Sequence, residues 1–171
     1  MTYSRKFKGM IFLVICGVLL TINPNDVSAQ REAKNAIYVS LLGTGLIYSV
    51  NYDRMLSDKV GFRLGFSTIS VTSTEPGDDD NVSLKTFPLT LNYLMGSGKH
   101  QLELGAGVVI VSVSGDIDEG AFEGSGVAGT GTFGYRFQPQ DGGFVFRLVL
   151  TPLFGSGGFA PWGGLSLGYS F

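Results

Sequence analysis

Five charged residues could meet in one place if this chain folds as a sheet. Each falls on the strand face that otherwise carries small residues, opposite bulky apolar neighbours: Asp53, Arg63, Glu103, Arg136 and Arg147. Charged groups out of reach of water need partners, because breaking a buried ion pair costs about 3–5 kcal/mol. The pattern predicts a structural carboxylate–guanidinium network, with Glu103 and Asp53 facing some of the arginines. The alternative is that some of the five lie at rims, in contact with water.

Strict alternation predicts the strands that would position these residues. In the last stretch, bulky apolar residues take one face (Leu165, Leu167, Tyr169, Phe171), and Ser166, Gly168 and Ser170 take the other. A lipid-facing barrel strand has this arrangement, with hydrocarbon outside and a crowded lumen inside. Strands are expected at residues 36–42, 46–55, 60–71, 84–95, 100–113, 127–137, 144–153 and 163–171.

The prediction is therefore an all-β fold, an eight-stranded antiparallel up-and-down transmembrane β-barrel. The parity of the first strand stays open, because apolar residues fall on both of its faces. Pro88 lacks a backbone donor and predicts a bulge or local break in the fourth strand.

Connection lengths support this topology. Short turns at residues 57–59, 96–99 and 139–143 are expected on the periplasmic side, and longer loops at 73–83, 114–126 and 155–162 on the outer side. A very short turn at 43–45 breaks the pattern. Two of the outer loops are acidic, through Asp78, Asp79, Asp80, Asp116, Asp118 and Glu119. Carboxylates could bind Ca²⁺ or ions that bridge lipopolysaccharide, but neither loop follows an EF-hand pattern, so solvated acidic loops are expected.

A catalytic or metal centre is not expected. His100 is the single histidine, and hydrolases need such a residue beside a Ser or acidic partner. It falls beside a predicted periplasmic turn, at the rim opposite to the outer leaflet where barrel lipid hydrolases work, so a solvated rim histidine is favoured. One histidine offers no cluster of imidazole ligands, and no cofactor is expected.

The first 29 residues have the pattern of a cleaved signal peptide. Basic residues at positions 5, 6 and 8 precede an apolar segment over 10–22, and Val27-Ser28-Ala29 forms a small-residue cleavage site. We expect cleavage before Gln30 and a barrel domain over 30–171. A retained anchor helix is disfavoured by the short apolar segment, and a lipoprotein site at Cys16 by the preceding Ile15. The mature chain would then contain no cysteine.

Composition agrees with export and disfavours nucleic acid. The 171-residue chain has 26 glycines and only 15% charged residues, against about 25% in typical soluble domains. Cleavage removes three of the 12 basic and one of the 14 acidic residues, which leaves a net charge near −4. A negative mature chain is a poor match for a nucleic acid or an anionic surface.

The segment Tyr48-Ser49-Val50-Asn51-Tyr52-Asp53-Arg54, after a glycine-rich turn, resembles a family of small outer-membrane β-barrel proteins. The architecture is similar to the eight-stranded barrels of OmpA and OmpX type. The resemblance covers the mature chain and carries no catalytic residues. It implies that the terminal aromatics, Tyr169 and Phe171, help the barrel-assembly machinery to recognise the last strand.

Together these observations predict a monomeric, non-enzymatic protein of a Gram-negative outer membrane. It would contact outer-membrane lipid and lipopolysaccharide, and would act as a structural or surface-interaction protein through its outer loops. A narrow porin-like channel and a lipocalin-like soluble ligand carrier remain as alternatives. A lipid-modifying enzyme is disfavoured by the position of His100.

Overall fold

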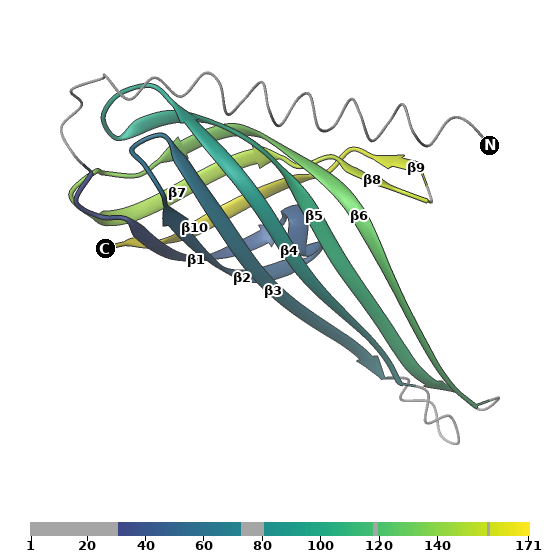
Figure 1. The fold of residues 1–171 in the computed structure, drawn as a ribbon. Helices are drawn as coiled ribbons and strands as arrows, with labels where there is room; N and C mark the ends of the chain where they lie inside the picture. Colours follow the sequence, from purple (N-terminus) through teal and green to yellow (C-terminus); the bar gives the residue numbers. More distant parts are fainter. Residues whose placement is uncertain (1–30, 73–80, 118–119, 157) are drawn as a thin grey trace, which may run out of the picture. The chain divides into compact units, whose positions relative to one another are not determined.

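The computed structural model describes residues 31–72, 81–117, 120–156 and 158–171 (Figure 1). The expected signal peptide and five acidic loop residues lie outside this part of the chain: Asp78, Asp79, Asp80, Asp118 and Glu119. Within the described ranges, no helix has the length and apolar character needed to cross a membrane.

The strands form one closed antiparallel barrel. Eight strands form its ring in the order β1(Asn35–Leu42), β2(Tyr48–Met55), β3(Val60–Thr72), β4(Asn81–Met95), β5(His100–Ile117), β6(Gly120–Phe137), β7(Gly143–Leu150) and β10(Gly163–Ser170). The ring closes where β10 pairs with β1, for example Val39 opposite Leu167. The eight-stranded antiparallel barrel expected from the sequence is confirmed.

The alternation of side chains is also confirmed. Bulky residues of the expected outward parity are exposed, among them Val50, Leu64, Leu91 and Leu148. The open parity of the first strand is resolved, because Ile37, Val39 and Leu41 point outward whereas Ala36, Tyr38 and Ser40 are buried. Tyr38 can point inward because it lies opposite Gly168, where a Cβ atom would collide with the tyrosine.

The prediction of a glycine-rich outer loop at residues 155–162 is wrong in part, because some of these residues form strands. Two short strands, β8(Leu153–Gly155) and β9(Gly158–Ala160), pair as a hairpin that continues from β7 and β10 and attaches to β6 at Gly129. Pro152 and Pro161 flank this hairpin and supply no backbone donor. These two prolines account for the breaks between β7 and β8 and between β9 and β10.

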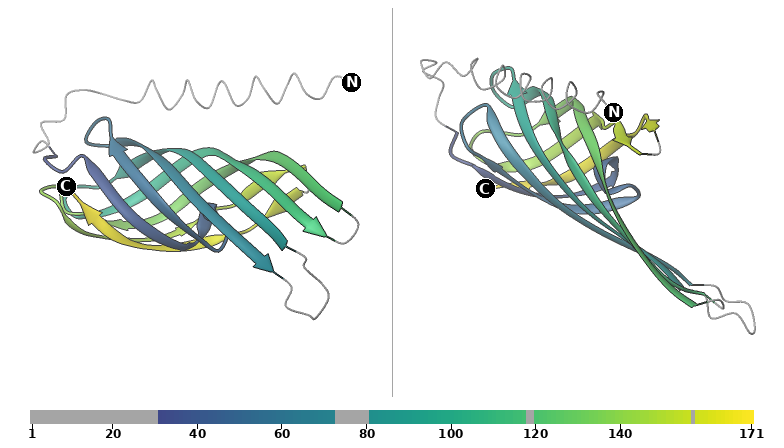
Figure 2. Two further views of the ribbon diagram at one scale, coloured as in Figure 1. Left: turned by 90° about the horizontal axis from the view of Figure 1, so that it is seen from below. Right: turned by 45° about the vertical axis from the view of Figure 1, so that its right-hand side comes forward.

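Four strands continue far beyond the rest of the barrel wall, and Figures 1 and 2 show them as a projecting sheet. We call this sheet the extension: residues 67–72 of β3, 81–86 of β4, 111–117 of β5 and 120–126 of β6. The prediction of a loop at residues 114–126 is therefore wrong for most of its length, because residues 114–117 belong to β5 and residues 120–126 to β6. Asp116, placed in that loop, is an exposed strand residue between Asn81 and Ala121. The polar side chains of this segment suggested a loop, but its backbone N–H and C=O groups are paired with neighbouring strands on both sides.

Two local expectations can be compared with the structure. The β3–β4 pairing is interrupted between Leu64–Leu89 and Ser67–Thr86 and resumes in the same register, so Pro88 causes a local break without a bulge. The turn at 43–45 is a buried 3-10 turn, η1(Gly43–Gly45), which contacts β3 and β4 inside the barrel. Leu42 and Leu46 flank it with φ of 61° and 72°, a left-handed conformation that leucine rarely adopts.

Candidate functional site: the ion network in the lumen

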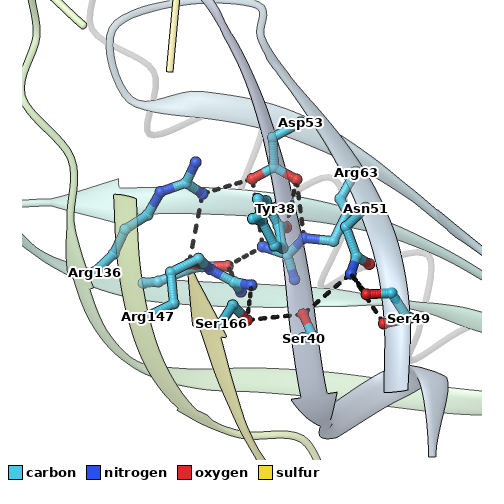
Figure 3. A network of polar contacts seen from close by, with 10 residues as sticks. Tyr38, Ser40, Ser49, Asn51, Asp53, Arg63, Arg136, Arg147 and Ser166 are labelled. Atoms are coloured by element: carbon cyan, nitrogen blue, oxygen red, sulfur yellow. Dashed lines mark hydrogen bonds and ion pairs between the residues drawn. The ribbon is translucent and has the colours of Figure 1, made fainter. Parts of the chain in front are cut away.

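Two carboxylates and three guanidinium groups meet in the middle of the barrel (Figure 3). Arg63 Nε lies 2.9 Å from Asp53 Oδ1, and Arg136 Nη1 lies 2.7 Å from Asp53 Oδ2. Glu103 Oε1 accepts from Arg63 Nη2 at 2.5 Å and from Arg147 Nη2 at 2.7 Å. A longer contact of 3.5 Å joins Arg136 to Glu103 Oε2. The structure thus brings together all five charged residues singled out in the sequence.

Strand register explains why both carboxylates are needed. Asp53 lies directly opposite Arg63 on the neighbouring strand, but Arg136 lies directly opposite Arg147. Two like charges in facing positions repel each other. Glu103 on β5 and Asp53 on β2 reach this arginine pair from other parts of the ring and supply its counter-charges.

Tyr38 completes the centre of the network. Its hydroxyl donates to Asp53 Oδ1 at 2.8 Å, and two guanidinium groups lie over its ring, with ring centroid to Cζ distances of 4.9 Å for Arg147 and 5.5 Å for Arg63. Such cation–π contacts strengthen when the groups are removed from water. Side chains from β1, β2, β3, β5, β6 and β7 therefore converge in one buried cluster.

A layer of small polar groups adjoins this cluster (Figure 3). Arg147 Nη1 donates to Ser166 Oγ at 3.3 Å, and Ser166 and Ser40 share a hydrogen bond of 2.8 Å. The Asn51 amide donates to Ser40 Oγ at 3.0 Å and to Ser49 Oγ at 2.9 Å. The charged cluster is thus continuous with neutral hydrogen bonds around the ring.

Arg31 lies beside the network, at the end of the barrel where β1 begins. It is 2% exposed, and its Nη2 donates to Gln101 Oε1 at 3.1 Å while its backbone N–H donates to Asp58 Oδ1 at 3.2 Å. The pKa of Arg31 is lowered to about 10, mainly because the group is buried and also because Arg136 places a positive charge nearby, while Asp58 acts in the opposite direction.

Sequence reasoning missed Tyr38 and Arg31. Tyr38 shares its parity with the small residues Ala36 and Ser40, which was the available signal for an inward position. Arg31 falls in a short polar segment before the first strand, where alternation gives no information.

The remaining candidates lie elsewhere. His100 is exposed on the outer face, where Nδ1 and the Tyr135 hydroxyl are 2.6 Å apart and its ring packs in a T-shaped arrangement with that of Phe137. Tyr169 and Phe171 point outward, with 62% and 54% of their surface exposed. Across the ranges that the structure describes, no three His, Cys, Asp or Glu residues are arranged to hold a metal ion.

The closed ring and its filled centre define a class, the small eight-stranded β-barrels. No family model and no curated protein matches the sequence. Solved structures do match. The N-terminal β-barrel domain of Pseudomonas aeruginosa OprF aligns with a TM-score of 0.59 and 15% identity, over 83% of this chain and 98% of that chain.

Ail, the attachment invasion locus protein of Yersinia pestis, aligns with a TM-score of 0.53 and 13% identity, over 82% of this chain and 99% of Ail. The structure of Ail in complex with the heparin analogue sucrose octasulfate aligns with a TM-score of 0.58 and 15% identity, over the same shares of the two chains. The chain therefore has the fold of small eight-stranded outer-membrane β-barrels, as the sequence resemblance implied.

Proposed function

We propose that this chain is an integral outer-membrane protein of a Gram-negative cell, exported through a cleaved signal peptide. Its barrel lumen is closed by the ion network, and its role is structural or surface-interacting, without catalysis. The extension, rather than long loops, forms the part that meets other molecules outside the membrane. The observation that carries this proposal is the apolar band on the outer face of the barrel.

This band is exposed although it is strongly apolar. Leu91, Leu148 and Leu150 each keep 57–61% of their surface exposed, and similar residues recur on every wall. A water-soluble monomer rarely exposes so large a patch, whereas a membrane protein presents it to lipid. On β4 the band runs over nine residues, from Phe87 to Met95, which matches the roughly 9–11 residues of a tilted membrane-spanning strand.

The band ends in a single step. One row of outward residues, Phe66, Phe87, Ile110 and Val127, is apolar, and the next row is Thr68, Lys85, Ser112 and Ser125. Such a change supports a boundary between hydrocarbon and water at this level. The extension would then begin where the membrane ends, and the short connections at the other end would face the periplasm.

The filled centre favours a closed barrel over the porin-like alternative. Glu103 and Arg136 are 0% exposed, and Asp53, Arg63 and Arg147 are each 2% exposed. An eight-stranded lumen is just wide enough for such side chains to fill. The same arrangement disfavours a lipocalin-like carrier, because the interior of this barrel is ionic and its outer surface is apolar.

The charge of the outer segments sets this chain apart from a binder of polyanions. Ail has been seen with the heparin analogue sucrose octasulfate. Segments 67–86 and 111–127 here contain one basic residue, Lys85, and eight acidic ones: Glu75, Asp78, Asp79, Asp80, Asp116, Asp118, Glu119 and Glu123. A sulfated polysaccharide would be repelled by this end of the molecule.

Cell fractionation combined with gel mobility tests the proposal. The mature protein should be recovered with the outer membrane and should migrate faster in an unboiled sample than in a boiled one, because a folded barrel resists detergent. Recovery in the soluble periplasm, or identical mobility in the two samples, would contradict it. Planar-bilayer recordings address the pore, since steady single-channel steps from pure protein would favour the porin-like alternative.

A further inference from the structure

Three buried side chains keep hydrogen-bond donors without an acceptor at the end of the barrel where β1 begins. They are Arg31 with Nε and Nη1, Arg136 with Nε and Nη2, and Gln138 with its amide nitrogen. None of these atoms has an acceptor among the residues that the structure describes, and each side chain belongs to a residue that is at most 2% exposed. Buried donors without a partner are rare in folded proteins, so this group of three points to a ligand.

Strand register places the three side chains in one layer of the lumen. Arg136 on β6 lies opposite Gln101 on β5, and Arg31 Nη2 donates to Gln101 Oε1 at 3.1 Å. Gln138 follows two residues after Arg136, and its backbone N–H donates to the carbonyl oxygen of Lys99. Because side chains alternate along a strand, Gln138 keeps the inward direction of Arg136, and it is fully buried.

Arg136 keeps one whole edge of its guanidinium unused. Its ion pairs, with Asp53 Oδ2 at 2.7 Å and with Glu103 Oε2 at 3.5 Å, both start from Nη1, as the dashed lines in Figure 3 show. Nε and Nη2 remain, and these two donors lie side by side on an edge that suits the bidentate binding of an anion. The ion network therefore uses only part of the binding capacity of this arginine.

The buried charges at this level do not balance. Within the described part of the chain, four arginines are buried, Arg31 and the three of the ion network, against two carboxylates. Asp58 is half-buried and accepts from the backbone N–H of Arg31, not from its guanidinium. The positive charge of Arg136 also contributes to the lowered pKa of Arg31. A buried excess of two positive charges calls for a counter-ion, because isolated buried charges are strongly destabilising.

The burial of the donors limits the size of that counter-ion. A phosphate headgroup or a sulfated sugar would need an opening that residues exposed by 2% or less do not offer. A water molecule would accept hydrogen bonds from these donors, but it would leave the excess of positive charge unchanged. A chloride ion meets both requirements, because it accepts several hydrogen bonds and carries a negative charge.

We propose that Arg31, Arg136 and Gln138 form a binding site for a small inorganic anion, chloride, beside the ion network. Arg136 would supply the Nε–Nη2 edge, Arg31 a second charged donor and Gln138 a neutral one. The ion would reduce the repulsion between the two arginines and so hold the segment before β1, which carries Arg31, inside the end of the barrel. This inference goes beyond the proposed function, since it requires only a folded barrel.

Crystals of the mature protein grown with sodium bromide in place of sodium chloride test the site directly. Bromide replaces chloride in such sites and scatters anomalously. An anomalous peak should lie within hydrogen-bonding distance of Nε and Nη2 of Arg136. The absence of density there, or density without an anomalous signal, would overturn the proposal, the second result in favour of water.

Urea unfolding of the full mature barrel in vesicles of zwitterionic lipid tests the site in solution. Sodium chloride is varied against sodium gluconate at constant ionic strength, because gluconate is too large for a buried site. Each tenfold rise of chloride above its Kd should raise the equilibrium constant for folding about tenfold, since the site exists only in the folded barrel.

Two variants alter the donors. Gln138→Leu removes the neutral donor, and Arg136→Lys keeps the charge but removes the pair of donors on one edge. Both should need roughly tenfold more chloride, or more, for the same stabilisation, because a hydrogen bond to a charged group is lost. The matched control is Gln140→Leu, the same change at a half-buried position, which should respond to chloride as the wild type does. Equal responses of Gln138→Leu and Gln140→Leu would overturn the proposal.

Unboiled gel mobility shows whether each variant is folded. If Arg136→Lys does not fold because Asp53 loses a partner, Gln138→Leu and the bromide crystals of the wild type still decide the question. A folded wild-type barrel whose stability does not respond to chloride refutes the anion site and leaves the outer-membrane proposal intact.

Discussion

Replacement of Glu103 with Gln removes one charge from the most heavily paired position in the barrel. Glu103 is 0% exposed and accepts hydrogen bonds from Arg63 and Arg147. The five-residue network changes from a net charge of +1 to +2, with Asp53 as the remaining counter-charge for three guanidinium groups. The amide nitrogen would also place a donor against an arginine donor.

The expected cost follows from these contacts. Removal of one partner from a buried ion pair destabilises a protein by about 3–5 kcal/mol. Gln retains one acceptor oxygen, and Asp53 still pairs with Arg63 and Arg136. We therefore expect the free energy of unfolding to fall by about 3 kcal/mol, near the lower end of this range.

Urea titration of the folded barrel in lipid vesicles measures this change. Trp162, the only tryptophan in the sequence, reports unfolding by fluorescence, and unboiled gel mobility provides an independent readout. The matched control is Glu123→Gln, which makes the same chemical change at an exposed position of β6. If the two variants unfold at the same urea concentration as the wild type, the network does not stabilise the barrel and the reasoning fails.

Four further outcomes are expected. Combining Glu103→Gln with Arg147→Gln restores a network charge of +1, so the double variant should be less destabilised than the sum of the two single variants in the same urea assay. Leu91→Arg, in the apolar band, should cost about 2–4 kcal/mol in vesicles, whereas Ser114→Arg, beyond the boundary, should cost less than 1 kcal/mol, and equal costs would contradict the boundary. Intact-mass analysis of protein from the outer membrane should give a chain that begins at Gln30, and any other start refutes the assigned cleavage site. Planar bilayers with wild-type protein should show no steady conductance, while the double variant, in which one arginine is shortened and the ion pairs between Glu103 and Arg147 are lost, should show more frequent openings; no difference between them would argue against closure by the network.

The sequence predicted the barrel because alternation acts locally. A residue such as Leu167 and its neighbour Ser166 report two environments without knowledge of the partner strands. The same argument placed five charged residues on the inward face, and the structure brings them together. What they contribute to stability stays a prediction until the Glu103 variant is measured.

Prediction from alternating polarity failed where the apolar residues switch from the outward to the inward face of a strand. It also failed for Arg31, which lies outside the strands. Ser114 and Asp116 were interpreted as part of a polar loop because apolar residues were expected on the outward face, yet on the same strand Val111 and Val113 place apolar side chains on the other face. The hairpin between Pro152 and Pro161 is stabilised by pairing with β6, a long-range contact that local sequence does not encode.

The pairing of β1 with β10 has a consequence for how the molecule is made. Ala36 and Ser170 become neighbours in the finished barrel although the other strands of its ring, β2 to β7, all lie between these residues in the sequence. The cylinder can therefore be sealed only after both of these strands have been made. Until then each of them has an open hydrogen-bonding edge that could pair with another chain.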